Sequence, residues 1–176
     1  AIVGLEPSCL LSLRDEFLAM GFGDAAVRLA GRAMLVEEFL AREHAAGRLR
    51  LPLGAIAQKR ALVHGHCHQK AFDALSPTVA MLKLVPGLAV DVVESSCCGM
   101  AGSFGYEAEH HELSMRMAEL SLLPAVRAAD ADTLVVADGT SCRHQIADGT
   151  RSGGAGREAL HAIRELASAL RTAPTP

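Results

Sequence analysis

Short apolar runs alternate with stretches of helical periodicity along this chain. Four such runs predict strands, at residues 1–5, 61–65, 89–94 and 133–137. Strands that alternate with helices favour parallel pairing, because each connection has to cross back over the sheet. We therefore expect an α/β fold of three layers, in which a mostly parallel sheet carries helices on both faces.

Apolar residues spaced by three and four positions predict the helices. A long amphipathic helix is expected from Asp24, a capping residue, to just before Gly47. Further along the chain, Leu113, Met117 and Leu120 are expected on one face of another helix. The predicted helical stretches are residues 10–18, 24–46, 76–85, 107–123 and 157–171. Pro124 can restart a helix directly after the fourth of these stretches.

A partial internal repeat suggests how the chain is organised. Aligning Cys9 with Cys142 sets IVGLEPSCLLSL over VVADGTSCRHQI, which is an apolar strand, a turn, Ser-Cys and the start of a helix in both cases. We expect residues 1–47 to be the end of a first repeat, 48–60 a connector, 61–171 a second repeat and 172–176 a disordered tail. The opening AIVGLEPSC, without methionine, predicts a fragment of a longer polypeptide.

Charge and composition argue against several classes of function. The net charge is −3, which provides no global field for binding nucleic acid. No apolar run is long enough for a membrane span, and no signal peptide opens the chain. We expect a cytoplasmic protein, free or associated with the inner face of the membrane.

The five cysteines are the main candidates for chemistry. An odd number of cysteines in a chain without a secretory signal argues against a disulfide framework. Each cysteine follows a predicted strand, and the carboxyl ends of parallel strands share one edge of a sheet, where ligands bind. We therefore expect the thiols to gather in space. They are Cys9, Cys67, Cys97, Cys98 and Cys142.

The spacing of these cysteines favours a multinuclear centre over a zinc ribbon. Thiolates select zinc, copper(I) or iron–sulfur clusters, and cluster iron is held by about four of them. The chain has no C-x-x-C pair, and the adjacent Cys97 and Cys98 can each reach a different metal ion. The neighbouring Gly99, Gly102 and Gly105 allow positive φ and a close approach of the backbone to a cofactor.

Histidines near the cysteines have two interpretations. His66 and His68 flank Cys67, and His144 follows Cys142. In the first interpretation, each histidine is a metal ligand, a proton carrier or a hydrogen-bond donor to cluster sulfur. In the second, it is a polar residue whose hydrogen bonds are satisfied in a loop at the end of a strand. His110 and His111, on a predicted helix, are expected on a solvated face.

Three motifs carry a family resemblance. HGHCHQKA, SSCCGMAGSFGYE and GTSCRHQI, in this order, resemble the second CCG repeat of the cysteine-rich domain family, and LEPSCLLSLRDEF is similar to the end of the preceding repeat. The family includes the heterodisulfide reductase B subunit and the iron–sulfur subunits of glycolate, lactate and anaerobic glycerol-3-phosphate oxidation. The likeness extends to the C-terminal region of FAD-linked oxidoreductases that fuse flavin, ferredoxin-like and CCG segments.

The resemblance implies an electron-transfer module with a [4Fe–4S] or related iron–sulfur cluster. Its metal ligands would be Cys67, Cys97, Cys98 and Cys142, with His66, His68, Gly99 and Gly102 around the cofactor and Cys9 as a further ligand if the two halves meet. FAD would be bound by another part of the polypeptide. The implied partners are the flavin and ferredoxin-like domains and a quinone or redox protein as electron acceptor. The implied substrate is a 2-hydroxy acid such as D-lactate, glycolate or D-2-hydroxyglutarate.

One departure from the family keeps the type of centre open. The fuller motif ends in C-x-x-C, whereas Gly139 replaces the first cysteine of that pair here. The four remaining thiols are compatible with a simple [4Fe–4S] cluster, with a zinc ion and with a site that is empty in the isolated protein.

Other classes of function are less well supported by the sequence. A thiol- or disulfide-reducing module would use the same cysteines. A nucleotide-binding domain would use Gly99, Gly102 and Gly105, but their G-x-x-G-x-x-G spacing differs from the dinucleotide fingerprint. GSFG lacks the G-x-S-x-G frame of a hydrolase.

Overall fold

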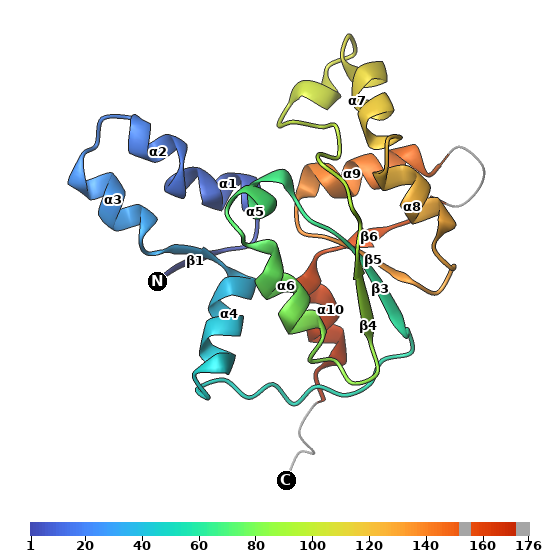
Figure 1. The fold of residues 1–176 in the computed structure, drawn as a ribbon, viewed down its shortest axis with the longest axis horizontal. Helices are drawn as coiled ribbons and strands as arrows, with labels where there is room; N and C mark the ends of the chain where they lie inside the picture. Colours follow the sequence, from blue (N-terminus) through green and yellow to red (C-terminus); the bar gives the residue numbers. More distant parts are fainter. Residues whose placement is uncertain (152–155, 172–176) are drawn as a thin grey trace.

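The fold is built on a four-stranded parallel sheet. In the computed structural model, which describes residues 1–151 and 156–171, the strand order is β4 (Ala89–Val92), β3 (Arg60–His64), β5 (Leu134–Ala137) and β6 (Ala159–Leu160). A separate two-stranded sheet pairs β1 (Ile2–Gly4) with β2 (Ala33–Leu35), also in parallel (Figure 1). The predicted tail at 172–176 lies outside the described residues.

Short helices connect these strands. In chain order the α-helices are α1 (Pro7–Leu11), α2 (Glu16–Ala19), α3 (Asp24–Ala30), α4 (Val36–Ala45), α5 (Cys67–Ala71), α6 (Leu75–Leu82), α7 (His111–Ala118), α8 (Leu122–Ala128), α9 (Thr140–Gly149) and α10 (Ala162–Ala169). Two 3-10 turns, at Ser12–Arg14 and Phe104–Tyr106, complete the described elements. None of the helices within the described residues is long and apolar enough to cross a membrane.

Both faces of the central sheet are covered. Successive side chains of a strand point to opposite faces, and β5 shows this alternation. Val136 packs in a core with Met81 of α6 and Leu166 of α10, whereas its neighbour Val135 packs in a second core with Ile146 of α9. The expected α/β fold, with a parallel sheet between helices, is confirmed.

Two predicted helices are wrong in part, because strands interrupt them. The stretch predicted as one helix from Asp24 to residue 46 forms α3, β2 and α4, since Ala33–Leu35 pairs with β1. The stretch at 157–171 begins with β6, which pairs with β5, and only then forms α10. In both cases the backbone hydrogen bonds of a neighbouring strand override the local helical pattern.

The buried face of α7 also differs from the prediction. Leu113 and Leu120 are exposed, while Ser114 is fully buried. The Gln145 side chain of α9 donates to the backbone oxygen of Ser114 at 3.0 Å and to its hydroxyl at 2.9 Å. A polar contact to α9 therefore orients α7, so that Leu113 turns outward while Ser114 and Ala118 are buried.

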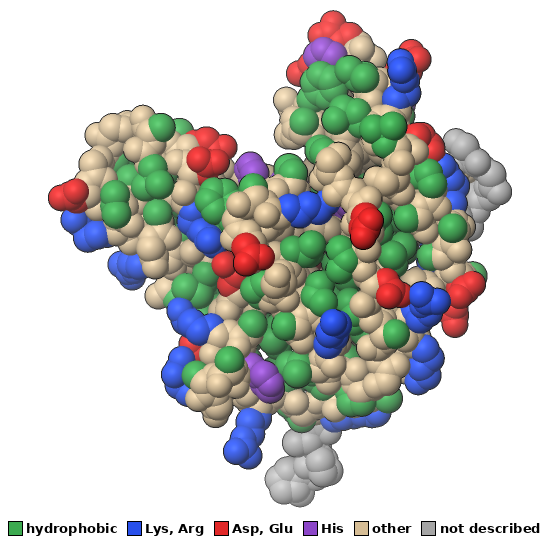
Figure 2. Space-filling model, in the orientation of Figure 1, with side chains coloured by type: hydrophobic (Ala, Val, Ile, Leu, Met, Phe, Trp, Pro, Cys, Tyr) green, Lys and Arg blue, Asp and Glu red, His purple; other side chains and the backbone are tan. Residues whose placement is uncertain are grey.

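A similar order of elements occurs twice in the chain, apart from the 3-10 turn, α2 and α3, which are inserted between α1 and β2. β1–α1–β2–α4 and β5–α9–β6–α10 each contain two parallel strands, and Cys9 and Cys142 are the third residues of α1 and α9. This arrangement agrees with the internal alignment of the two cysteines. Figure 2 shows the surface hollowed between the projection that carries α7 and the one that carries α2 and α3; α1, α5 and α9 lie between these projections in Figure 1.

Candidate metal centre

All five cysteines line one cavity of about 640 Å³ at the carboxyl ends of the strands. The side chains come from three helices and one loop: α1, α5, α9 and the segment after β4. Cys98 and Cys142 are buried, Cys67 and Cys97 are half-buried, and Cys9 is exposed. The topology therefore brings together thiols that are far apart in the sequence.

Cys67 is placed by the cap of α5. The His66 side chain accepts a hydrogen bond from the His68 backbone at 3.2 Å, and the Gln69 side chain accepts one from the His66 backbone at 2.9 Å. These two bonds form a capping box, so that Cys67 begins the helix directly after His66. The Cys67 thiol lies 3.7 Å from Nδ1 of His66.

Cys97 and Cys98 lie in a loop that is held from both sides. On one side, the Lys70 ammonium donates to the backbone oxygens of Ser95 and Ser96. On the other side, Gly99 adopts φ +96°, and a Cβ at this position would lie 2.2 Å from the backbone oxygen of Ser114 in α7. The Gly99 backbone N–H donates to the Cys97 sulfur at 3.3 Å.

The glycines after the cysteine pair differ in the space around them. Gly99 provides the close approach to α7 described above, and Gly105 contacts Met100 and Ser114 where a Cβ would not fit. Gly102, with φ +70° and nothing within 4 Å of a Cβ, lines the cavity itself. Of the three glycines, Gly102 is thus the one beside open space.

Cys142 lies in the first turn of α9, a helix of ten residues. The partial positive charge at a helix N-terminus favours a thiolate at this position. Gly139 is the N-cap residue, and a Cβ there would lie 2.4 Å from the imidazole of His66 and 3.2 Å from the Cys142 sulfur. The His66 ring therefore occupies the space beside Cys142 into which a side chain at position 139 would extend.

The four thiols interact with one another, and these interactions separate their pKa values. A hydrogen bond from Cys67, followed by one from Cys98, lowers the pKa of Cys97, while the pKa of Cys67 is raised by the same contact. A hydrogen bond from Cys98 lowers the pKa of Cys142 to about 5, and the pKa of Cys98 is raised. Two of the four positions therefore favour the thiolate form, which is the form that binds metals.

His64 is a site residue that the sequence analysis missed. It ends β3, is 1% exposed, and its Nδ1 lies 2.9 Å from the Ser95 hydroxyl. Its Nε2 has no hydrogen-bond partner within the described residues, and one ring nitrogen lies within 4.8 Å of both the Cys98 and the Cys142 sulfur. The spacing His64, His66, His68 at the end of a predicted strand was the available signal.

The other histidines named from the sequence differ in their relation to the cavity. His66 and His68 line the cavity, and burial lowers the pKa of His66. His144 does not line it but binds the hydroxyl of Tyr106, which does, at 2.7 Å. His110 stacks on Phe104 with ring centroids 4.1 Å apart.

Glu6 connects the first half of the chain to the second beside this cavity. Its carboxylate accepts from the backbone N–H of Thr140 at 2.9 Å and from the Thr140 hydroxyl at 2.8 Å. Burial acts to raise the pKa of Glu6, but the hydrogen bonds from Thr140 and Ser8 outweigh it and lower the pKa. The two halves therefore meet at the site, and Cys9 faces the same cavity as the other four thiols.

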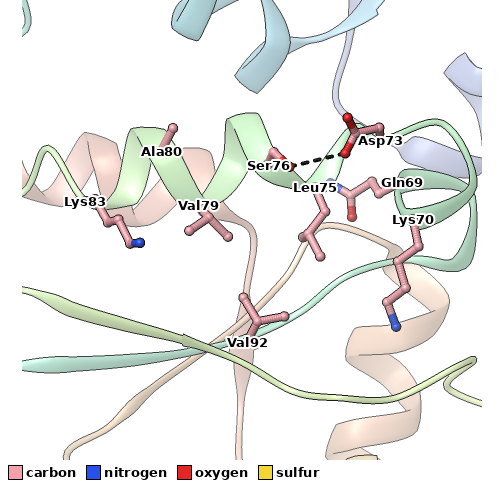
Figure 3. Close-up of a pocket in the computed structure, with 9 residues that line it drawn as sticks. All are labelled: Gln69, Lys70, Asp73, Leu75, Ser76, Val79, Ala80, Lys83 and Val92. Atoms are coloured by element: carbon pink, nitrogen blue, oxygen red, sulfur yellow. Dashed lines mark hydrogen bonds between the residues drawn. The ribbon is translucent and has the colours of Figure 1, made fainter.

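A second cavity, of about 530 Å³, lies on the other side of α5. Figure 3 shows it between α6 and β4, with Leu75, Val79 and Val92 as its apolar lining and Lys70 and Lys83 at opposite ends. Lys70 lines this cavity and also donates a hydrogen bond to the backbone of the loop that carries Cys97 and Cys98. None of the residues that line it is a cysteine.

Sequence comparison identifies relatives among known proteins. The chain is 30% identical over 145 residues to one of the subunits of anaerobic glycerol-3-phosphate dehydrogenase from Escherichia coli K12. It is 31% identical over 147 residues to D-2-hydroxyglutarate dehydrogenase of the same organism, and 29% identical over 169 residues to the enzyme of that name from Pantoea ananatis. No protein-family model and no solved structure matches the chain.

These relatives are longer than the chain. The first two matches cover 82% of this chain, but only 35% of the glycerol-3-phosphate dehydrogenase subunit and 14% of the hydroxyglutarate dehydrogenase. The resemblance expected from the three cysteine motifs is confirmed as homology: the chain is homologous to a part of each of these two dehydrogenase proteins.

Proposed function

We propose that this chain is an electron-transfer domain that holds an iron–sulfur centre through Cys67, Cys97, Cys98 and Cys142. The observation that carries the proposal is the convergence of these four thiols on one cavity, from three separate segments of the chain. Iron–sulfur clusters are normally held by four cysteine thiolates.

The chemistry of the donor set fits such a centre. The four thiols line one cavity, and interactions among them lower the pKa values of Cys97 and Cys142. The buried Nε2 of His64 has no partner within the described residues and provides a further polar group at this position. When bound, an iron–sulfur cluster would supply reversible one-electron transfer.

The surrounding residues would position and tune the centre. The Gly99 backbone N–H already donates to the Cys97 sulfur, and hydrogen bonds to sulfur are one of the factors that set a cluster's reduction potential. Lys70 adds a positive charge to the loop before Cys97. Cys9 is placed to serve as an additional ligand or as a free thiol beside the centre.

The larger reaction is proposed from the relatives. Their names describe dehydrogenation of glycerol-3-phosphate and of D-2-hydroxyglutarate, both of which carry a hydroxyl group. We propose that the chain acts as part of an FAD-linked oxidoreductase for a 2-hydroxy acid. Flavin and ferredoxin-like domains would deliver electrons to it, and a quinone or a redox protein would accept them.

Anaerobic reconstitution tests the proposed centre. Protein incubated with ferrous iron and sulfide should retain about four iron and four sulfide ions per chain and show visible thiolate-to-iron absorption that a one-electron reductant bleaches. Cys98→Ser should lose most of this iron, whereas Cys9→Ser should keep it if four thiols suffice. Retention of one zinc ion and no iron after the same treatment would show that the site is a zinc centre instead.

Thiol–disulfide exchange is the second candidate function. It is favoured by the contact between Cys67 and Cys97, in which Cys97 has a lowered pKa. The two thiols would pass two electrons to an external disulfide, so that one disulfide forms in the protein and two thiols are released. Metal-free protein that reduces a model disulfide with loss of two protein thiols, and a Cys97→Ser variant that does not, would support this function.

A further inference from the structure

A second group of ligand-type side chains lies away from the cysteine cavity. Glu37 comes from the first turn of α4, Asp138 from the end of β5, and His161 from the residue before α10. They are 0%, 2% and 8% exposed, and one ligand atom from each lies within 4.8 Å of the others. None of the three lines the cavity that the cysteines share.

The hydrogen bonds of His161 fix which nitrogen faces the carboxylates. Its Nε2 lies 2.9 Å from the backbone oxygen of Leu5, which can only accept, so Nε2 carries the hydrogen. Nδ1 carries the lone pair of the ring, and this lone pair accepts from the backbone N–H of Ile163 at 3.2 Å, so a metal ion bound at Nδ1 would replace that hydrogen bond. The same atom lies 3.4 Å from Oδ1 of Asp138 and 3.5 Å from Oε1 of Glu37.

Asp138 is well supplied with donors. Its Oδ2 accepts from the Gln69 amide at 2.7 Å and from the Thr78 hydroxyl at 3.2 Å, and its Oδ1 accepts from the backbone N–H of Ala162 at 3.0 Å. These bonds give both oxygens of the buried carboxylate a hydrogen-bond donor.

Glu37 has no such support. Neither of its carboxylate oxygens has a hydrogen-bond partner within the described residues, although the side chain is fully buried. Burial, and then the charge of Asp138, raises the pKa of Glu37 to about 8. The unpartnered Glu37 carboxylate thus lies close to the Asp138 carboxylate beside Nδ1 of His161, an arrangement that is costly unless a cation or a proton occupies the space.

We propose that Glu37, Asp138 and His161 bind one divalent cation, and that Zn²⁺ is the ion best suited to this donor set. One imidazole and two carboxylates are ligands that zinc accepts. With bonds of about 2.0–2.2 Å, ligand atoms of a tetrahedral zinc ion lie about 3.3–3.6 Å apart. The distances of 3.4 and 3.5 Å from Nδ1 to the two carboxylates fit this spacing.

The surroundings of the three residues also fit a metal site. A metal-binding histidine typically donates its other ring N–H to a backbone carbonyl or carboxylate, as His161 does to Leu5. Metal-binding carboxylates are typically held by further hydrogen bonds, as Asp138 is by Gln69 and Thr78.

The site would join the two halves of the chain beside the cysteines. Glu37 belongs to the first half, and Asp138 and His161 to the second. Asp138 also binds Gln69, which caps α5 at His66, next to Cys67. An ion at this position would therefore stabilise the frame on which Cys67 is placed, without contacting the cysteine centre. Binding of this ion would not depend on which metal or cluster the cysteines hold.

Cobalt titration can separate this site from the cysteine site, using Co²⁺ as a probe for Zn²⁺. Thiolate ligands give Co²⁺ an intense charge-transfer absorption, and a site without thiolates does not. Wild-type protein should bind one Co²⁺ that shows only the weak bands of nitrogen and oxygen ligands, in addition to any ion at the cysteines. Zn²⁺ should displace it. Because loss of an outer-shell partner alone weakens metal binding about 10- to 100-fold, Glu37→Gln should weaken the non-thiolate Co²⁺ site by more than about tenfold.

Glu165→Gln is the matched control. Glu165 is also buried and also has an oxygen without a hydrogen-bond partner within the described residues, but it lies outside the group of three. It should leave the non-thiolate Co²⁺ site unchanged. Equal losses in both variants would overturn the proposal.

Wild-type protein alone provides a second test, which holds even if a variant fails to fold. Native mass spectrometry should find one Zn²⁺ more than the cysteine site accounts for. If no such ion binds, the proposal is wrong. If, in addition, metal-free Glu37→Gln is more stable than wild type, a proton on Glu37 occupies the space instead.

Discussion

The carboxylate of Glu6 accepts hydrogen bonds from both the backbone N–H and the hydroxyl of Thr140, although 134 positions separate the two residues in the chain. Glu6 is the N-cap residue of α1, and Thr140 is the first residue of α9. One side chain therefore caps two helices, each of which carries a cysteine of the cavity at its third position.

Replacing Glu6 should separate the two halves of the site. Glu6→Ala removes the side-chain bonds to α1 and α9, and we expect a loss of about 1–3 kcal/mol in the free energy of unfolding. Urea unfolding followed by circular dichroism measures it. Glu94→Ala, at an exposed position, is the control and should change stability little. A loss no larger in Glu6→Ala than in this control would contradict the capping role.

The two glycines after the cysteine pair should differ in their tolerance of alanine. At Gly99, a methyl group would lie 2.2 Å from the backbone oxygen of Ser114, with φ at +96°, so Gly99→Ala should cost more than about 2 kcal/mol of stability. Gly102 has φ +70° but open space, so Gly102→Ala should cost only about 1–2 kcal/mol. Thermal unfolding of the two variants side by side tests this order, and a reversed order would refute the packing argument.

Much of the fold could be predicted from the sequence, and the errors have physical causes. The apolar runs before His64 and Asp138 form strands as predicted, because a strand buried on both faces is apolar at every position. β2 was missed because Ala33 also fits a helical spacing with Leu29 and Val36, and only the pairing of Ala33–Leu35 with β1 makes this segment a strand.

The candidate site could be predicted only at the level of topology. The rule that parallel strands end at one edge predicted that the cysteines would gather, and they line one cavity. No local pattern predicts that Glu6 caps α9 or that, within the described residues, the Nε2 of His64 is left without a partner beside Cys142. These contacts depend on how the two halves pack, which the spacing of residues does not encode.

Placing the family's additional cysteine at position 139 should lower the stability of the protein. In Gly139→Cys the new Cβ would lie 2.4 Å from the His66 ring, so we expect a lower melting temperature than wild type. His66→Asn shortens the side chain but keeps a good N-cap residue for α5. In a double-mutant cycle, the double variant should lose less stability than the sum of the losses in the two single variants. Additive effects would show that His66 is not the obstacle.

Glu37 should make the stability of metal-free protein depend on pH. Its folded-state pKa of about 8 lies above the ordinary value of 4.5, so the native state binds more protons than the unfolded state between these values. The free energy of unfolding should therefore fall as the pH rises from about 5 to 8. Glu37→Gln should flatten this dependence, and Glu94→Gln should not. Added Zn²⁺ should reduce the decline in wild type, and an unchanged slope in Glu37→Gln would contradict the assignment.

Lys70 should order the loop that carries Cys97 and Cys98. Its ammonium donates to the backbone oxygens of Ser95 and Ser96, and these bonds hold the segment between β4 and the cysteine pair. Lys70→Met keeps most of the side-chain length but removes the donors. We expect faster hydrogen exchange of the backbone amides at residues 95–99 and faster alkylation of Cys97, measured by mass spectrometry.

Lys83→Met is the matched control, because Lys83 lines the same cavity in Figure 3 but makes no hydrogen bond to this loop within the described residues. If both variants exchange at the wild-type rate, the loop is held by Gly99 and α7 alone. Faster exchange in Lys70→Met only would show that the hydrogen bonds of Lys70 order this loop.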